Sequence, residues 1–196
     1  MTLPAYETLR TSLEGGLFTL TLNRPNAANA IDMTLGRELM DAVTRADANP
    51  NVRVLLLNAT GKMFSGGGDL ASFSQYGDDV ARALRELTGY LHLAVARLLR
   101  AHMPVVVAVN GVAAGGGMSL ALAGDIVLAA ESARFTMAYT KAGLVPDGGS
   151  TFVLPKLVGL RRAQELIYTN RVLSAKVAVE CGLVTRVVAD AELAGE

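Results

Sequence analysis

Residues 103–125 read MPVVVAVNGVAAGGGMSLALAGD and join an apolar run to a glycine-rich bend and a segment of small residues. The run Val105–Val109 is largely β-branched, which is typical of a strand buried on both faces. Asn110-Gly111 predicts a sharp turn, because both residues tolerate a left-handed backbone. Gly115–Gly117 lack Cβ atoms, and the helix predicted after them leaves its first amides unpaired at the positive end of its dipole. The stretch therefore predicts a backbone site that stabilises an anion.

The identity of the anion stays open at this point. No Gly-Lys-Ser/Thr follows the glycines, which argues against a phosphate-binding P-loop, and their spacing does not match the dinucleotide fingerprint. A purely structural alternative is that three glycines let a helix pack closely on a strand.

A second glycine-rich bend has the same arrangement. The run Val52–Ala59 predicts a buried strand, and it leads into GKMFSGGGDL at residues 61–70. The two bends, centred on Gly68 and Gly116, follow separate strands. Right-handed parallel connections would bring both bends to the same end of a sheet.

Length and composition indicate one globular domain spanning residues 1–196. Apolar residues make up 51% of the chain and charged residues 18%, which excludes a disordered chain. Lys+Arg and Asp+Glu both number 18, so the net charge gives no reason to expect nucleic acid or an anionic membrane as partner. No apolar run is long enough to span a bilayer.

Cysteine and histidine are scarce. The single cysteine, Cys181, cannot form an internal disulfide, and the N-terminal MTLPAYETLR lacks a signal-peptide pattern, so we expect a cytoplasmic protein. His92 and His102 do not form a zinc-type cluster with it, so no metal is expected and both histidines are predicted to be structural.

The remaining elements follow from hydrophobic periodicity and capping residues. Asp32 is expected to cap a helix, and Ser174 another. We predict strands at 17–23, 125–130 and 183–188, helices to about 47 and at 80–102, 160–169 and 174–181, a polar loop at 72–79 and a tight turn at 145–150.

The sequence resembles the crotonase, or enoyl-CoA hydratase/isomerase, superfamily over nearly its whole length. The resemblance rests on FTLTLNRP at 18–25, FSGGGDL at 64–70, NGVAAGGGMSLALAGD at 110–125, GLVPDGG at 143–149 and GLVTRVV at 182–188. It implies an α/β spiral of ββα units. The C-terminal helical segment that completes the trimer in that family is expected to be missing here, and a homotrimer or dimer of trimers is expected for a full-length chain.

The resemblance also implies a chemistry, the stabilisation of an enolate made from an acyl-CoA thioester. The amides of Gly68 and Gly116, one from each bend, would form the oxyanion hole. Losing one such donor typically costs about 10² to 10³ in rate. CoA enters as part of the substrate, and no separate cofactor is expected.

Two positions argue against the family's hydration reaction. A hydratase carries two glutamates, and the matching residues here are Ser119 and Tyr139. Serine cannot activate water as glutamate does, and a tyrosine with a pKa of roughly 10 is a poor base. The alternative is that Ser119 packs as a small helical residue while Tyr139 shapes the substrate pocket.

Asp147 is the remaining candidate for acid–base chemistry. Pro146-Asp147-Gly148 is an ordinary turn sequence, but it is similar to the pattern in enoyl-CoA isomerases of phenylacetate-type pathways. In the related chlorobenzoyl-CoA dehalogenases an aspartate here is the nucleophile. One carboxylate beside an oxyanion hole suffices for a 1,3-proton shift, so we predict an enoyl-CoA isomerase with Asp147 as base. The alternatives are hydratase-like, hydrolase or dehalogenase activity, or acyl-CoA binding without catalysis.

The family places CoA along the loop after the first strand and along the first bend. Arg24 or Lys62 would meet a phosphate or simply be solvated, and Asp69 is expected to brace its loop. The residues predicted to contact CoA are Asn26, Ala27, Ala28, Ser65, Gly66 and Gly67.

Overall fold

Two β-sheets organise the computed structural model of the protein, which describes residues 4–196. The first three residues of the N-terminal stretch considered above lie outside the described residues. The six-stranded sheet has the order β1-β2-β3-β5-β7-β10, in which β1 and β2 are antiparallel and all later neighbours are parallel. Its strands are β1 (Leu9–Glu14), β2 (Leu17–Leu22), β3 (Val54–Ala59), β5 (Val105–Val109), β7 (Ile126–Ala130) and β10 (Arg186–Val188).

The smaller sheet contains four short strands in the order β4-β6-β8-β9. The first three are parallel, and β9 is antiparallel to β8. Its strands are β4 (Met63–Ser65), β6 (Val112–Ala114), β8 (Arg134–Thr136) and β9 (Leu173–Ser174).

A repeating unit connects the two sheets. Strands β3, β5 and β7 of the large sheet are followed by β4, β6 and β8 of the small one, and a helix comes next each time. The three units therefore wind as a spiral of ββα units, as the resemblance implied. Both glycine-rich bends occupy the same place in this unit, between the short strand and its helix, which brings them together.

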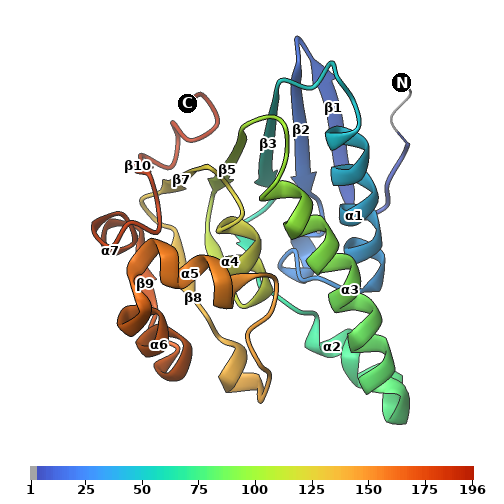
Figure 1. Ribbon diagram of the computed structural model, residues 1–196, viewed down its shortest axis with the longest axis vertical. Helices are drawn as coiled ribbons and strands as arrows, with labels where there is room; N and C mark the ends of the chain where they lie inside the picture. The colour runs from blue at the N-terminus through green and yellow to red at the C-terminus, as the bar shows by residue number, and fades with distance from the viewer. Residues whose placement is uncertain (1–3) are drawn as a thin grey trace.

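The helices cover the sheets from the side facing the viewer in Figure 1, where α1 and α3 lie side by side in front of β1–β3. The long helices are α1 (Met33–Asp47) and α3 (Val80–Leu98). The others are α2 (Leu70–Phe73), α4 (Gly116–Ala121), α5 (Ser150–Val158), α6 (Leu160–Thr169) and α7 (Ala175–Glu180), with 3-10 turns η1 (Pro25–Ala27), η2 (Ser74–Asp79) and η3 (Tyr139–Ala142).

Local sequence explains why these elements form. Phe18, Leu20 and Leu22 alternate along β2 and are fully buried, so one face of the strand lies in the core. The side chain of Asp32 accepts the Leu35 amide at 2.8 Å and caps α1 as predicted. Ser174 caps α7 in the same way through Val177, at 3.3 Å.

Several predicted boundaries differ from the structure. The helix expected to reach His102 ends at Leu98, because the chain turns toward Pro104 and the start of β5. Residues 72–79 are not a loop but the end of α2 and the 3-10 turn η2. Strands predicted at 52–59 and 183–188 begin two and three residues later, at Val54 and Arg186. Strand β1 and the four strands of the small sheet were not predicted. The strands of the small sheet have two or three residues each, which is too short for periodicity to reveal.

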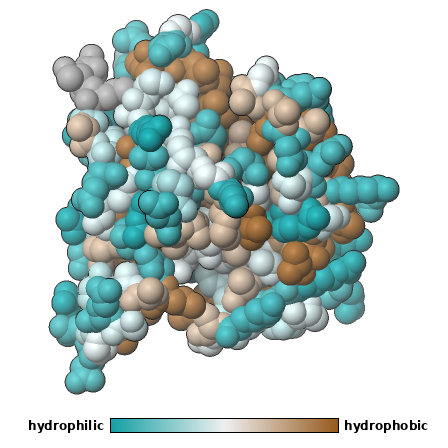
Figure 2. Space-filling view, turned by 180° about the vertical axis from the view of Figure 1, so that it is seen from behind, coloured by the Kyte–Doolittle hydropathy of each residue, from teal (hydrophilic) through white to brown (hydrophobic). Residues whose placement is uncertain are grey.

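The side of the molecule seen from behind carries hydrophobic patches between hydrophilic side chains (Figure 2). A cavity of about 490 Å³ lies between the large sheet and residues near the C-terminus, and Leu17, Val54 and Leu193 are among its lining. Within residues 4–196, no helix is both long and apolar enough to cross a membrane.

Candidate active site

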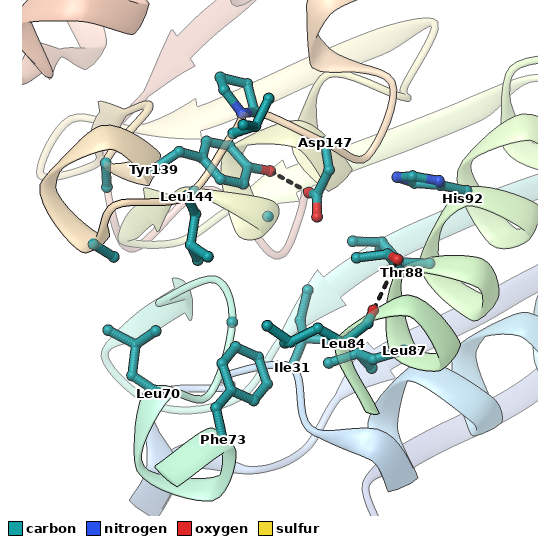
Figure 3. A pocket seen from close by; sticks show the side chains of 18 of the residues that line it. Ile31, Leu70, Phe73, Leu84, Leu87, Thr88, His92, Tyr139, Leu144 and Asp147 are labelled. Carbon is teal, nitrogen blue, oxygen red and sulfur yellow. Dashed lines mark hydrogen bonds between the residues drawn. The ribbon is translucent and has the colours of Figure 1, made fainter. Parts of the chain in front are cut away.

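A cavity of about 400 Å³ lies where the two glycine-rich bends meet α3 and the turn after η3 (Figure 3). Its wall is mainly aliphatic and aromatic, which suits an apolar ligand with few polar contacts. The apolar side chains include Ile31, Leu70, Phe73, Leu84, Leu87, Leu91 and Leu144.

The first bend contributes to this cavity a residue, Gly68, whose amide is unpaired. On either side of Gly68 the backbone bonds to Ile31: the Ile31 amide donates to the Gly67 carbonyl at 2.7 Å, and the Asp69 amide donates to the Ile31 carbonyl at 3.1 Å. Gly68 lines the cavity, and in the described part of the chain no acceptor takes its N–H. The amide is therefore held in place and free for a ligand.

The second bend also has an unpaired amide, at the start of α4. Gly115, with a φ of +52°, precedes the helix, and its amide donates to the Thr136 carbonyl at 3.0 Å. Gly116 is the first helical residue, so its N–H has no partner within the helix. No other acceptor among residues 4–196 takes it, and it also lines the cavity.

The two bends pack directly against each other. A Cβ placed on Gly67 would lie 2.6 Å from the Ala114 carbonyl oxygen and 3.1 Å from the Gly116 nitrogen. A Cβ on Gly117 would lie 2.5 Å from the Ser65 carbonyl oxygen. Glycine is therefore required on both sides of this contact, because any side chain would push the two free amides apart.

Ser65 is part of the support for this contact. Its buried hydroxyl donates to the Asn29 carbonyl at 2.8 Å and accepts the Gly67 amide at 3.2 Å. Gly66 in turn donates its amide to the Ala28 carbonyl at 2.9 Å. These bonds tie the first bend to the loop after β2.

An arginine clamps the same loop from the other side. Arg24 bonds to the Ala30 carbonyl and forms ion pairs with Asp32 at 2.9 Å and Asp69 at 3.1 Å. Asp69 also caps α2 by accepting the Ser72 amide at 3.1 Å. Arg24 is therefore neither free for a phosphate nor simply solvated, whereas the prediction that Asp69 braces its loop is confirmed.

Two polar residues of the cavity lining, Tyr139 and Asp147, belong to a hydrogen-bonded chain of three side chains. The Tyr139 hydroxyl donates to Asp147 Oδ1 at 2.7 Å, and the Ser119 hydroxyl lies 2.7 Å from the Tyr139 hydroxyl. Ser119 and Tyr139 are 1% and 6% exposed, and Asp147 is half-buried. Figure 3 shows Tyr139 and Asp147 pointing toward each other, with the second carboxylate oxygen directed away from the phenol.

The environment of Tyr139 keeps its phenol protonated. Burial, reinforced by the charge of Asp147, raises the pKa of Tyr139 well above its ordinary value. A neutral phenol beside a carboxylate donates its only proton to it, so the phenol oxygen accepts from Ser119. Tyr139 thus supports Asp147 and is not a base itself.

The cavity includes some of the predicted site residues and not others. Gly66, Gly68, Gly116, Tyr139 and Asp147 line it. The other predicted site residues lie outside the cavity lining of the described structure: Asn26, Ala27, Ala28, Ser65, Gly67 and Ser119. That they contact CoA or substrate stays a prediction.

One side of α3 was not recognised as part of the site. Thr88 and His92 line the cavity together with Leu84 and Leu91, whereas the sequence predicted only a helix over these residues and a structural role for His92. In the view of Figure 3, Asp147 lies between Tyr139 and His92. Helical periodicity shows which face is covered, but not whether a ligand or the core covers it.

The family model for enoyl-CoA hydratase/isomerase matches residues 12–196 of the chain. The chain belongs to the enoyl-CoA hydratase/isomerase family. Its fold is the crotonase fold: a solved enoyl-CoA hydratase from Bacillus anthracis superimposes with a TM-score of 0.90 at 34% identity, covering 96% of this chain and 73% of that one.

Curated members of the enoyl-CoA hydratase/isomerase family carry different reaction names. A 1,2-epoxyphenylacetyl-CoA isomerase from Escherichia coli (strain K12) is 40% identical over 189 residues, 96% of this chain and 72% of the relative. A crotonyl-CoA hydratase from Syntrophomonas wolfei is 39% identical over 194 residues, 98% of this chain and 73% of the relative. Membership of the family therefore does not fix the reaction, which depends on the residues of this site.

Proposed function

We propose that the protein is an isomerase of enoyl-CoA thioesters, in which Asp147 moves a proton while the amides of Gly68 and Gly116 hold the thioester oxygen. Membership of the enoyl-CoA hydratase/isomerase family supports a CoA thioester as substrate. The apolar wall of the cavity suits the acyl chain.

The observation that carries this proposal is the position of Asp147. Among the described residues it is the only carboxylate that lines the cavity, and Gly68 and Gly116, whose amides are free, line the same cavity. A single carboxylate beside two donors matches a reaction that moves one proton within the substrate and adds nothing to it.

The proton and electron balance is simple. Asp147 Oδ2 takes a proton from C2 of a 3-enoyl thioester, and the electron pair delocalises over the double bond onto the thioester oxygen. The amides of Gly68 and Gly116 stabilise the resulting dienolate. Asp147 then returns the proton to C4, which leaves a conjugated 2-enoyl thioester and a carboxylate ready for the next cycle.

Crowding at Ser119 weighs against hydration. The resemblance places a hydratase glutamate at this position, but a Cβ on Gly148 would lie only 2.8 Å from the Ser119 Cβ. The turn that carries Asp147 therefore packs on Ser119. A water molecule held by two glutamates has no counterpart in this arrangement.

The test is to incubate the protein separately with 3-enoyl-CoA and 2-enoyl-CoA thioesters of several chain lengths, following the conjugated thioester by absorbance and the products by mass. We expect the double bond to move without a change in mass. Asp147→Asn should lower kcat by about 10² or more, because the base is lost. Asp78→Asn is the matched control, since Asp78 is exposed on η2 and outside the cavity lining.

The same assay separates the alternatives. A product one water heavier identifies a hydratase, release of the CoA thiol identifies a hydrolase, and a covalent adduct on Asp147 identifies a nucleophilic route. Full turnover by Asp147→Asn would remove Asp147 from the mechanism. Tight acyl-CoA binding without turnover would indicate a binding protein.

A further inference from the structure

Ser119 is buried, makes no contact with the cavity, and still bonds to the residue that holds Asp147. We propose that Ser119 and Tyr139 are positioning residues that fix Asp147 relative to the oxyanion hole. The catalytic role of these two residues rests on the proposed function. The hydrogen bonds that join them to Asp147 do not depend on it.

The direction of the chain follows from counting protons. The Tyr139 hydroxyl has one proton, and the carboxylate of Asp147, 2.7 Å away, can only accept it. The 2.7 Å contact with Ser119 must then use the serine proton, with the phenol oxygen as acceptor. The other acceptor near the serine hydroxyl, the Gly115 carbonyl, is farther away at 3.3 Å and already takes the Ser119 amide at 3.0 Å.

The chain begins on the helix that carries half of the oxyanion hole. Gly116 is the first residue of α4, and Ser119 follows three residues later, so both lie on the same side of the helix. A Cβ on Gly116 would lie 3.8 Å from the Tyr139 hydroxyl. One turn of α4 therefore sets the distance between the Gly116 amide and the hydroxyl that orients Asp147.

The carboxylate is fixed at one oxygen and open at the other. Tyr139 holds Asp147 Oδ1, while Figure 3 shows the second oxygen directed away from the phenol. The backbone of Asp147 is held separately, because its carbonyl accepts both the Ser150 amide at 3.0 Å, a bond that Ser150→Ala keeps, and the Ser150 hydroxyl at 2.7 Å. With the main chain fixed by Ser150, the phenol selects the orientation of the carboxylate within the cavity.

Proton transfer depends strongly on this orientation, since a misplacement of about 1 Å can cost about 100-fold in rate. Ser119→Ala should therefore lower kcat about 10-fold while leaving KM unchanged, because Ser119 is outside the cavity lining. Tyr139→Phe should lower kcat by at least as much. Adding Ser119→Ala to Tyr139→Phe should have no further effect on kcat, because the serine acts through the phenol.

A spectroscopic measurement tests the chain without substrate. A buried hydroxyl proton in a short bond to a carboxylate exchanges slowly and gives a low-field proton NMR line. We expect such a line in the unmutated protein, its loss in Tyr139→Phe, and a shift to higher field in both Asp147→Asn and Ser119→Ala. The shift in Ser119→Ala follows because donation by the serine polarises the phenol.

Ser150→Ala is the matched control. Ser150 is also 1% exposed and also loses one hydroxyl bond, but that bond reaches the Asp147 carbonyl and not the carboxylate. Its low-field line should stay in place. A missing line in the unmutated protein, or a line that Ser119→Ala does not move, would overturn the proposal. A line that responds as expected in a protein without isomerase activity would leave the positioning chain intact and refute only the proposed function.

Discussion

Gly67 packs so closely on Ala114 that a Cβ at position 67 would stand 2.6 Å from the Ala114 carbonyl oxygen. This contact joins the two glycine-rich bends and sets the spacing of the two free amides. A single methyl group at position 67 should therefore have a large effect, because the neighbour is backbone and cannot rotate away.

We expect Gly67→Ala to abolish most activity. Its φ of +88° disfavours a side chain, and the collision with Ala114 would separate the Gly68 and Gly116 amides. A loss of about 10² in kcat/KM corresponds to one oxyanion donor displaced. Gly15→Ala is the control: its φ is +56° in the β1–β2 turn, and nothing lies within 4 Å of its Cβ position. Equal activity in the two variants would contradict the steric argument.

Arg24 should stabilise the first bend by neutralising two carboxylates. Asp32 and Asp69 each cap a helix and lie 2.9 Å and 3.1 Å from the guanidinium, with side chains 20% and 14% exposed. Arg24→Met should lower the free energy of unfolding by about 1–3 kcal/mol, less than for a fully buried pair because water screens these groups. It should also lower kcat, since Gly68 is adjacent to Asp69.

Urea unfolding and steady-state kinetics measure both effects of Arg24→Met. Arg82→Met is a suitable control, because the Arg82 side chain is 69% exposed and its nearest carboxylate, Asp79, lies 3.6 Å away. That variant should change stability by less than about 1 kcal/mol. A loss no larger than this for Arg24→Met would show that the clamp does not stabilise the fold.

The sequence predicted the backbone features of this site better than its side-chain contacts. The two glycine-rich bends and the caps by Asp32 and Ser174 were recognisable, because turn and capping preferences are local. The Arg24 clamp and the Ser119–Tyr139–Asp147 chain were not, because they join residues that only the tertiary structure brings together. Ser119 illustrates the difference: its sequence context indicates a small helical residue, and only the distance to Tyr139 assigns it a partner.

Alkaline pH should destabilise the protein through Tyr139. Burial and Asp147 raise the pKa of Tyr139 above its unfolded value of about 10, so the folded state binds the phenol proton more tightly. This contribution to stability is complete below pH about 10 and is lost as the pH rises further. Tyr6, whose pKa burial and Asp41 also raise, contributes in the same direction.

Urea unfolding between about pH 9 and pH 11 measures this dependence. Tyr139→Phe should make the decline of the unfolding free energy shallower, by an amount that grows as the pH rises past about 10 and approaches about 1.4 kcal/mol per pH unit, the slope that one proton contributes. Tyr168→Phe, at a residue that is 72% exposed, should leave the slope unchanged. Identical slopes in the two variants would exclude Tyr139 as the source.

Ser119→Glu should fail to introduce hydration, although it restores the residue type that the family resemblance assigns to a hydratase. The backbone of Gly148, whose φ is +57°, packs closely on Ser119, since a Cβ added at Gly148 would lie 2.8 Å from the Ser119 Cβ. We therefore expect a longer side chain at position 119 to displace the turn that carries Asp147. Overpacking of this kind typically costs about 1–3 kcal/mol of stability. Isomerisation should fall further than in Ser119→Ala, because the glutamate both removes the donor to Tyr139 and moves the base. Product masses after incubation with 2-enoyl-CoA decide the question, since a hydrated product from Ser119→Glu would mean that the turn yields easily and that residue 119 alone separates the two reactions.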